Sequence, residues 1–193
     1  MRIFLAGATG VIGSRLIPLL VTAGHDVAGM TRSERAVPRL LAAGAVPIVC
    51  DVFDAAGLVR AVTEFGPDVV LHQLTDLPDD RAALAGAAEA NARIRTEGTR
   101  NLISAARSAG ATGFVAQSIA WAPTSPVAAE AARDLERQVL EFGGVALRYG
   151  QFYGPGTYFP DELPPAPCVE IGRAAARTVQ HLAAPSGIVE VVD

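Results

Sequence analysis

The sequence predicts an α/β protein, a single Rossmann-like domain over residues 1–193 in which helices cover both faces of a doubly wound parallel sheet of about seven strands. Short apolar runs alternate along the chain with alanine-rich segments of helical period. Three glycines, Gly7, Gly10 and Gly13, follow the first apolar run at once. Continuously apolar strands separated by helices are typical of a parallel sheet that is buried on both faces.

Each strand is expected where a short, mostly apolar run stands between polar, glycine or proline residues. The opening run RIFLA is the first of these, and the later segments DVVLHQ and VALRY have the same character. In chain order, the expected strands are residues 2–6, 26–30, 46–50, 67–73, 113–118, 145–149 and 188–192.

Helices are expected where apolar residues recur every three to four positions and capping residues stand at the ends. Ser33 is placed to cap the second helix, and Gly24 and Gly44 follow the ends of the first two. A bend is expected near Gly86 or Gly98 in the longest helix. In chain order, the expected helices are residues 10–22, 34–42, 54–64, 80–109, 127–142 and 169–183.

The composition excludes several functional classes. A net charge of −4 without a basic cluster provides no electrostatic field for nucleic acid. No stretch reaches the 18 apolar residues of a membrane span, and Arg15 interrupts the apolar run that a signal peptide would need. Cys50 and Cys168 have no metal-binding or redox spacing. We therefore expect a cytoplasmic protein with reduced thiols and no metal site, whose partner is a small-molecule substrate.

The chain contains no lysine, because all 16 basic residues are arginines. This absence excludes a Schiff base, a Walker phosphate loop and a tyrosine–lysine proton relay. A bias towards alanine, glycine and arginine is also what a GC-rich genome produces.

The three glycines predict a dinucleotide-binding turn, since the first strand-to-helix turn of this fold faces the ligand crevice. Gly7 permits a tight turn, Gly10 lets the backbone approach a pyrophosphate, and Gly13 lets the helix pack close to the strand. The helix N-terminus adds free N–H groups and a partial positive charge. The neighbours in this turn that are predicted to contact the cofactor are Thr9, Val11 and Ile12.

The glycines are spaced GxxGxxG, and GATGVIG resembles the nucleotide motif of the extended and atypical short-chain dehydrogenases/reductases, the NAD-dependent epimerase/dehydratase family. DVVLHQLT, EGTRNLISAA and LRYGQFYGPGT resemble three later segments of that family, so that the likeness covers residues 1 to about 160. The further residues that the resemblance places against the cofactor are Asp51, Val52, Gln73, Leu74, Thr75 and Gln117.

The end of the second strand favours NADP over NAD. An acid there would hold the ribose 2′-hydroxyl of NAD, whereas an arginine suits the 2′-phosphate of NADP. The segment GMTRSER offers Thr31 and Arg32, with no acid before Glu34, and Arg32 could bind a phosphate through two hydrogen bonds. NAD stays an alternative, because Arg32 could also be a solvated loop residue.

The resemblance implies hydride transfer, which in this family is assisted by a tyrosine, a lysine and a serine or threonine. Ser118 ends the fifth strand and is the candidate for the serine. Alignment on Glu136 puts Ala128 at the tyrosine and Ala132 at the lysine, so the Tyr-xxx-Lys pair is missing. Tyr153 is a candidate replacement acid, although an aromatic residue that packs beneath its loop would look the same in the sequence.

Two other polar residues stand on strands at the crevice. His72 and water are further candidates for the missing acid, but a histidine inside a strand is better explained as a buried core residue. Arg148 is best explained as a structural ion-pair partner.

The leading hypothesis is a compact NADP(H)-binding oxidoreductase of small-molecule or secondary metabolism, acting on a carbonyl or alcohol with a non-standard proton donor. Two alternatives stay open: a non-redox cyclase, dehydratase or isomerase of the same fold, and a non-catalytic protein that senses nucleotide. Residues 150–170, which are rich in proline, are expected to form a reduced substrate-binding part. The helical region 80–109 is expected to form a homodimer.

Overall fold

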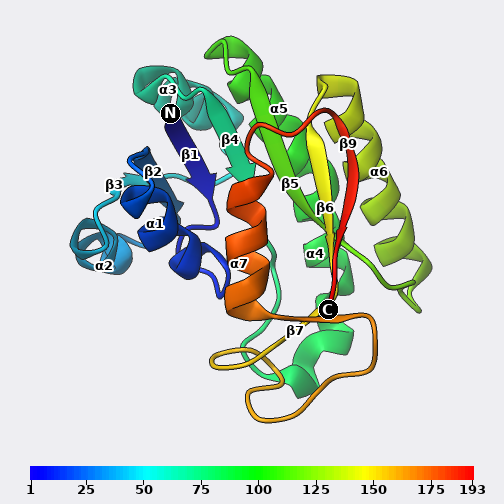
Figure 1. The fold of residues 1–193 in the computed structure, drawn as a ribbon. Coiled ribbons are helices and arrows are strands. Elements are labelled where there is room, and N and C mark those ends of the chain that lie inside the picture. The colour runs from blue at the N-terminus through cyan, green and yellow to red at the C-terminus, as the bar shows by residue number, and fades with distance from the viewer.

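The structure, a computed structural model, describes the backbone of all 193 residues and every side chain except that of Ala85. Seven parallel strands form one sheet in the order β3-β2-β1-β4-β5-β6-β9 (Figure 1), which confirms the predicted fold class. The strands of this sheet are β1 (Arg2–Ala6), β2 (Asp26–Thr31), β3 (Val46–Val49), β4 (Val69–His72), β5 (Gly113–Ile119), β6 (Val145–Tyr149) and β9 (Gly187–Val191).

Helices cover both faces of the sheet. One face is covered by α1 (Gly13–Thr22), α2 (Val37–Ala42) and α7 (Ile171–Gln180). The other face is covered by α3 (Ala55–Phe65), α5 (Thr99–Ser108) and α6 (Pro126–Phe142), with α4 (Ala88–Arg93) packed on α6. The remaining helical elements are the 3-10 turns η1 (Glu34–Ala36) and η2 (Arg81–Ala87) and the π-helical turn η3 (Ile94–Gly98).

Apolar side chains fill the space between the sheet and each helical layer. Leu16 of α1 and Ile171 of α7 are fully buried on one face, and Leu102 of α5 and Val139 of α6 on the other. Burial of one such side chain contributes roughly 1.5–3 kcal/mol. Because both faces of the sheet are covered, the interior strands must be apolar on both sides, as their sequences are. Among the described residues, no helix is long and apolar enough to cross a membrane.

The strand order creates a crevice at the carboxyl edge of the sheet. The chain runs outward from β1 to β2 and β3, then returns to β4 on the other side of β1. A reversal of this kind leaves room for a ligand beyond the carboxyl ends of the two strands. At the same edge, in the lower part of Figure 1, β7 (Gln151–Tyr153) and β8 (Cys168–Glu170) pair as a small parallel sheet that the sequence did not predict.

The helical region over residues 80–109 differs from the continuous helix that we expected. Asp80 begins it, since Asp80 Oδ1 accepts a hydrogen bond of 2.9 Å from the Ala82 N–H. The chain then passes through η2, α4, η3 and α5, and the π-helical turn ends at Gly98, where a bend was expected. Such a turn inserts one extra residue into a helix and is frequent at functional sites.

Three predicted helix starts also need correction. Within the described contacts, the Ser33 side chain makes no capping hydrogen bond; its N–H donates to Thr31 Oγ1 at 3.2 Å. The first helix begins at Gly13, because the residues before it form the glycine turn. The last helix begins at Ile171, after β8, and is capped by the Glu170 carboxylate, which accepts two N–H groups of the first turn at 2.8 Å.

Candidate cofactor and substrate site

The turn between β1 and α1 has the geometry of a phosphate cradle. Gly7 has a φ of 90°, and a Cβ there would lie 2.5 Å from the carbonyl oxygen of Gln73. A Cβ at Gly13 would overlap the Gly7 carbonyl. A Cβ at Gly10 would meet only the Gly7 oxygen, at 3.4 Å, so the described residues leave open space beyond Gly10. A dinucleotide pyrophosphate fits this opening at the N-terminus of α1.

Two arginines stand near this turn, Arg32 directly after β2 and Arg39 on α2. Arg32, which is largely exposed, pairs with Asp76 through Arg32 Nη2 and Asp76 Oδ1 at 3.5 Å. Arg39 of α2 donates a hydrogen bond of 2.9 Å from its Nη2 to the carbonyl oxygen of Thr9. Arg39 was not predicted from the sequence. Its available signal was its place on the helix that follows Arg32 and the second strand.

The predicted cofactor residues gather at the carboxyl edge, but their exposure differs. Asp51 is exposed, and its Oδ1 accepts a hydrogen bond of 2.9 Å from the Phe53 N–H. Val52 is 2% exposed and packs into the core. All of these residues lie at or near the ends of β1 to β5 or in the turns that follow: Gly7, Thr9, Gly10, Val11, Ile12, Gly13, Thr31, Arg32, Asp51, Val52, Gln73, Leu74, Thr75 and Gln117.

His72 ends β4 as a buried, neutral side chain. Its Nδ1 accepts a hydrogen bond of 3.3 Å from the Leu74 N–H, so its Nε2 carries the proton that is shared with Thr99 Oγ1 at 3.0 Å. Burial, and then the charge of Arg95, lower the pKa of His72 to about 3. A ring held in this way does not supply a proton near neutral pH.

We expect the ring signals of His72 to stay constant between pH 5 and 8, because the folded protein holds the imidazole neutral far below its ordinary pKa. An NMR titration of the labelled ring measures this, with His72→Asn to assign its signals. An inflection between pH 5 and 8 would contradict the assignment of a neutral, buried ring.

Gln73 connects the cofactor edge to α7 through a chain of hydrogen bonds. Thr178 Oγ1 donates to the Ala174 carbonyl at 2.7 Å, so Tyr149 must donate to Thr178, at 2.6 Å, and Gln73 Nε2 donates to Tyr149, at 3.5 Å. This order leaves Gln73 Oε1 as an enclosed acceptor without a partner among the described residues. The chain of bonds fixes the orientation of the amide.

Ser118 belongs to a polar cluster at the end of β5. Its hydroxyl donates to Glu136 Oε1 at 2.6 Å, and Arg148 binds both oxygens of the same carboxylate, at 2.8 and 2.7 Å. Burial opposes ionisation of Glu136, but the hydrogen bonds from Arg148 and Ser118 outweigh it and hold the pKa below its ordinary value. Arg148 is therefore the ion-pair partner that we expected, and the Ser118 proton is committed to Glu136.

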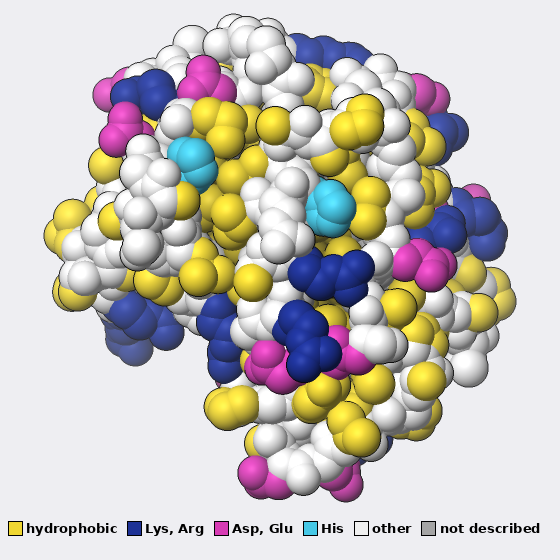
Figure 2. Space-filling model, viewed as in Figure 1, with side chains coloured by type: hydrophobic (Ala, Val, Ile, Leu, Met, Phe, Trp, Pro, Cys, Tyr) yellow, Lys and Arg dark blue, Asp and Glu magenta, His cyan; other side chains and the backbone are white. Residues whose placement is uncertain are grey.

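The places of the family's tyrosine and lysine are held by small side chains. Ala132 of α6 is 7% exposed and Ala128 is half-buried. Tyr153 on β7 donates its hydroxyl proton to Asp193 Oδ2 at 2.8 Å, and this hydrogen bond raises the pKa of Tyr153. Asp193 also pairs with Arg173 at 2.6 Å. Figure 2 shows basic and acidic side chains next to one another on this face of the molecule. Ser118 and Tyr153 thus contact different partners, and their catalytic roles stay predictions.

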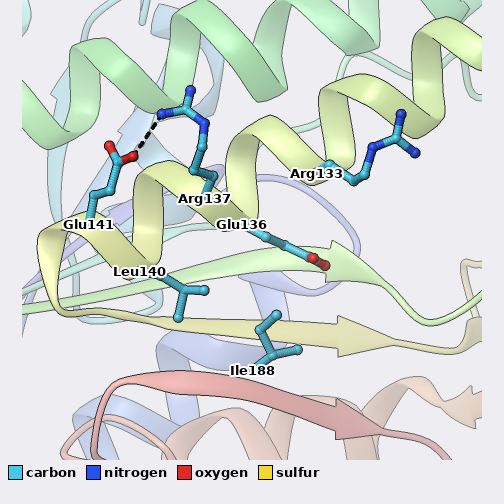
Figure 3. A pocket seen from close by; sticks show the side chains of 6 residues that line it. All are labelled: Arg133, Glu136, Arg137, Leu140, Glu141 and Ile188. Carbon is cyan, nitrogen blue, oxygen red and sulfur yellow. Dashed lines mark hydrogen bonds and ion pairs between the residues drawn. The ribbon is translucent and has the colours of Figure 1, made fainter.

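An open hollow of about 510 Å³ lies between α6 and the edge strand β9, and Glu136 of the polar cluster is one of the residues that line it. Figure 3 shows Leu140 and Ile188 on opposite sides of it and the ion pair between Arg137 and Glu141 above it. Ile188 stands near the start of β9 and Leu140 near the end of α6, so the hollow lies away from the glycine turn. We do not assign it to the cofactor. No cluster of three or more metal-ligating side chains occurs among the described residues.

Curated relatives of the chain include two reductases. Over 180 residues it is 40% identical to the 3-diazoavenalumate denitrifying reductase of a Streptomyces species, a match that covers 81% of this chain and 58% of that protein. Over 112 residues it is 33% identical to the 4-hydroxy-2-methyl-3-oxo-4-farnesyl-3,4-dihydroquinoline-1-oxide ketoreductase of Stigmatella aurantiaca, covering 56% of this chain and 30% of that protein. The chain thus spans less than two thirds of either relative.

Solved structures share the fold and are longer. The UDP-glucose 4-epimerase of Thermotoga maritima superposes with a TM-score of 0.80 at 14% identity, covering 100% of this chain and 77% of that one. The NAD complex of the Thermus thermophilus UDP-glucose 4-epimerase gives 0.77 at 22% identity, covering 100% and 78%. The family model for the NAD-dependent epimerase/dehydratase family matches residues 3–133. With its glycine turn and its strand order, the chain belongs to the NAD-dependent epimerase/dehydratase family.

Proposed function

We propose that this protein is a reductase that uses NADPH in preference to NADH. It reduces a small molecule without the help of a catalytic tyrosine–lysine pair. The observation that carries the proposal is the glycine turn, which is tightly packed at Gly7 and Gly13 and open only beyond Gly10. The 40% identity to a reductase supports the reaction type. The absence of lysine separates this chain from the usual proton relay of the family.

The residues at the carboxyl edge have separate tasks in this proposal. A bound nicotinamide dinucleotide supplies a hydride. Gly10 and the N-terminus of α1 hold the pyrophosphate, and Arg32 and Arg39 hold the 2′-phosphate by charge-assisted hydrogen bonds. His72 keeps the backbone after β4 in place through the Leu74 N–H.

The absence of the tyrosine–lysine pair also limits which hydride acceptor the protein can reduce. A carbonyl that receives a hydride leaves an oxyanion, which must take up a proton. A carbon that carries a diazonium group gains the hydride's electron pair and loses the C–N pair with N₂, so atoms and charge balance without a proton from the protein. Ala128 and Ala132 cannot supply a proton, and the Ser118 proton is held by Glu136. We therefore propose a diazonium compound as acceptor, in line with the diazo substrate in the name of the Streptomyces relative.

A carbonyl acceptor is the second candidate. The name of the Stigmatella relative, a ketoreductase, favours it, and so does a serine at the end of β5. In that case the Ser118 hydroxyl must leave Glu136 and donate to the carbonyl oxygen as the hydride arrives. The non-redox enzyme and the nucleotide sensor stay open as alternatives, and the following test distinguishes both of them from a reductase.

The test compares para-carboxybenzenediazonium with para-carboxybenzaldehyde as acceptors in the presence of NADPH. We expect the protein to consume NADPH and release N₂ with the diazonium compound, above the rate without protein and above that of a Gly10→Val variant. Faster consumption with the aldehyde would favour the carbonyl acceptor. Binding of NADPH without turnover of either compound would contradict the reductase and favour a nucleotide sensor.

We expect Arg32→Ala to weaken NADPH binding about tenfold and to leave NADH binding nearly unchanged, because only NADPH carries the 2′-phosphate. The effect is limited by the exposure of Arg32 and by the loss of its ion pair with Asp76. Arg39→Ala should act in the same direction. Fluorescence titration with both cofactors measures the ratio, and Arg35→Ala, an exposed arginine of η1, is the control. Equal losses for both cofactors would contradict the assignment.

We also propose the homodimer through residues 80–109, with α5 at its centre and the adjoining surface of α6 beside it. A groove of about 290 Å³ lies between these helices and contains Arg100, Arg107 and Glu141. Charges of both signs allow a second copy to pair with the same surface. Sedimentation equilibrium of the protein and of Arg107→Glu tests this, and a protein that is monomeric at all concentrations would contradict it.

A further inference from the structure

Arg95 is a buried cation that the cofactor proposal does not use. It lies in the π-helical turn η3 and is 8% exposed. Among the described residues it makes no hydrogen bond and no ion pair within 4.0 Å, although a guanidinium carries five N–H donors. No Arg95 nitrogen is among the enclosed side-chain atoms that lack a partner, so the guanidinium keeps contact with solvent and its donors are available to a ligand.

The position of Arg95 is at the carboxyl edge of the sheet. Thr99, four residues later, contacts His72 at the end of β4. Asn91, four residues earlier, accepts a hydrogen bond of 3.1 Å from the Asp76 N–H, beyond the end of β4. Helical side chains lean towards the N-terminus of their helix, which here is the crevice side. Arg95 therefore lies at the crevice edge of the sheet, close enough for its charge to act on His72 and Glu136.

The charges around Arg95 leave it without a carboxylate of its own. Its carboxylate neighbour is Glu136, whose charge opposes the lowering of the Arg95 pKa by burial. Glu136 is already bound to both Arg148 and Ser118. His72 is neutral at pH 7. Arg148 has Glu190 of β9 as a second carboxylate neighbour, whereas only Glu136 acts on Arg95. The glycine turn, which would take a pyrophosphate, follows β1 on the other side of β4.

We propose that Arg95 is the anion-binding group of the substrate site and that the acceptor carries a carboxylate. This inference rests on the proposed function, because it assigns Arg95 to the acceptor and the glycine turn to the cofactor. The guanidinium binds the carboxylate by charge-assisted hydrogen bonds.

The test uses the NADP⁺-loaded protein and two probes, cinnamate and its neutral match cinnamamide, each titrated by calorimetry. We expect the protein to bind cinnamate at least about tenfold more tightly than cinnamamide, the scale of one charge-assisted hydrogen bond. Arg95→Met should lose this preference, Arg95→Lys should keep part of it, and Arg133→Met, an exposed arginine of α6, should keep all of it. A preference that persists in Arg95→Met, or that is absent from the unmodified protein, would overturn the proposal.

A second measurement separates a binding role from a structural one. Removal of a buried charge that has no carboxylate of its own does not lower stability, so the unfolding midpoint of Arg95→Met is expected to equal or exceed that of the unmodified protein. The NADP⁺ affinity of Arg95→Met should stay within about twofold; a large loss would assign Arg95 to the cofactor and overturn the proposal. If the protein binds no NADP⁺, the proposed function fails, while the cinnamate preference and its loss in Arg95→Met still decide the role of Arg95.

Discussion

A Gly10→Val variant is expected to lose at least about a hundredfold in NADPH affinity while it stays folded. The Cβ itself meets only the Gly7 carbonyl oxygen, at 3.4 Å, so the turn can hold it with a small adjustment. The two methyl groups then extend into the opening where a pyrophosphate must approach the backbone. Several hydrogen bonds to the phosphates are lost together, which accounts for the size of the effect.

Two matched variants make this result specific. A Cβ at Gly187 meets no described atom within 4 Å, so Gly187→Val should preserve both NADPH binding and stability. A Cβ at Gly13 would overlap the Gly7 backbone, so Gly13→Val should lower the unfolding midpoint as well as the affinity. Calorimetry and thermal unfolding measure both quantities. If Gly10→Val binds NADPH as the unmodified protein does, the turn has no ligand role.

The sequence predicted the sheet well because strand and helix here depend on local apolar patterns. All seven strands of the main sheet were located to within two residues at each end, and the strand order follows from right-handed crossovers around β1. The small sheet of β7 and β8 was missed, since two three-residue strands that pair across the proline-rich loop leave no periodic signal. The π-helical turn η3 was missed for a similar reason, as helical periodicity does not distinguish it from a bend.

The cofactor side of the site could be predicted because glycine spacing has a direct backbone cause. Gly7 and Gly13 must be glycines because a Cβ at either position would collide with neighbouring backbone atoms. The polar cluster was harder, because Ser118, Glu136 and Arg148 come from β5, α6 and β6 and meet only in the folded chain. Arg95 was not singled out at all. One arginine among 16 has no signal in the sequence, and only burial and the lack of a partner identify it.

A Glu136→Gln variant is expected to lower the free energy of unfolding by about 2–4 kcal/mol at pH 7. The Glu136 carboxylate, 7% exposed, accepts two hydrogen bonds from Arg148 and one from Ser118. Glutamine offers one oxygen in place of two and directs an NH₂ group at a guanidinium, so Arg148 loses the carboxylate that binds both of its nitrogens. Because the Arg148 side chain is 37% exposed, water relieves part of this cost, and we expect less than for a fully buried pair.

The pH dependence of stability identifies the carboxylate as the cause. The folded-state pKa of Glu136 lies below its ordinary value of 4.5, so its contribution is complete above about pH 4.5 and is lost as the pH falls through the folded-state pKa. Chemical unfolding at pH 7 and at acidic pH should therefore show the difference between the unmodified protein and Glu136→Gln shrinking on acidification. Glu141→Gln, which breaks an exposed ion pair with Arg137, should change stability by less than about 1 kcal/mol at any pH. A constant difference across this range would mean that the glutamine acts through packing, and that Arg148 does not depend on the charge of Glu136.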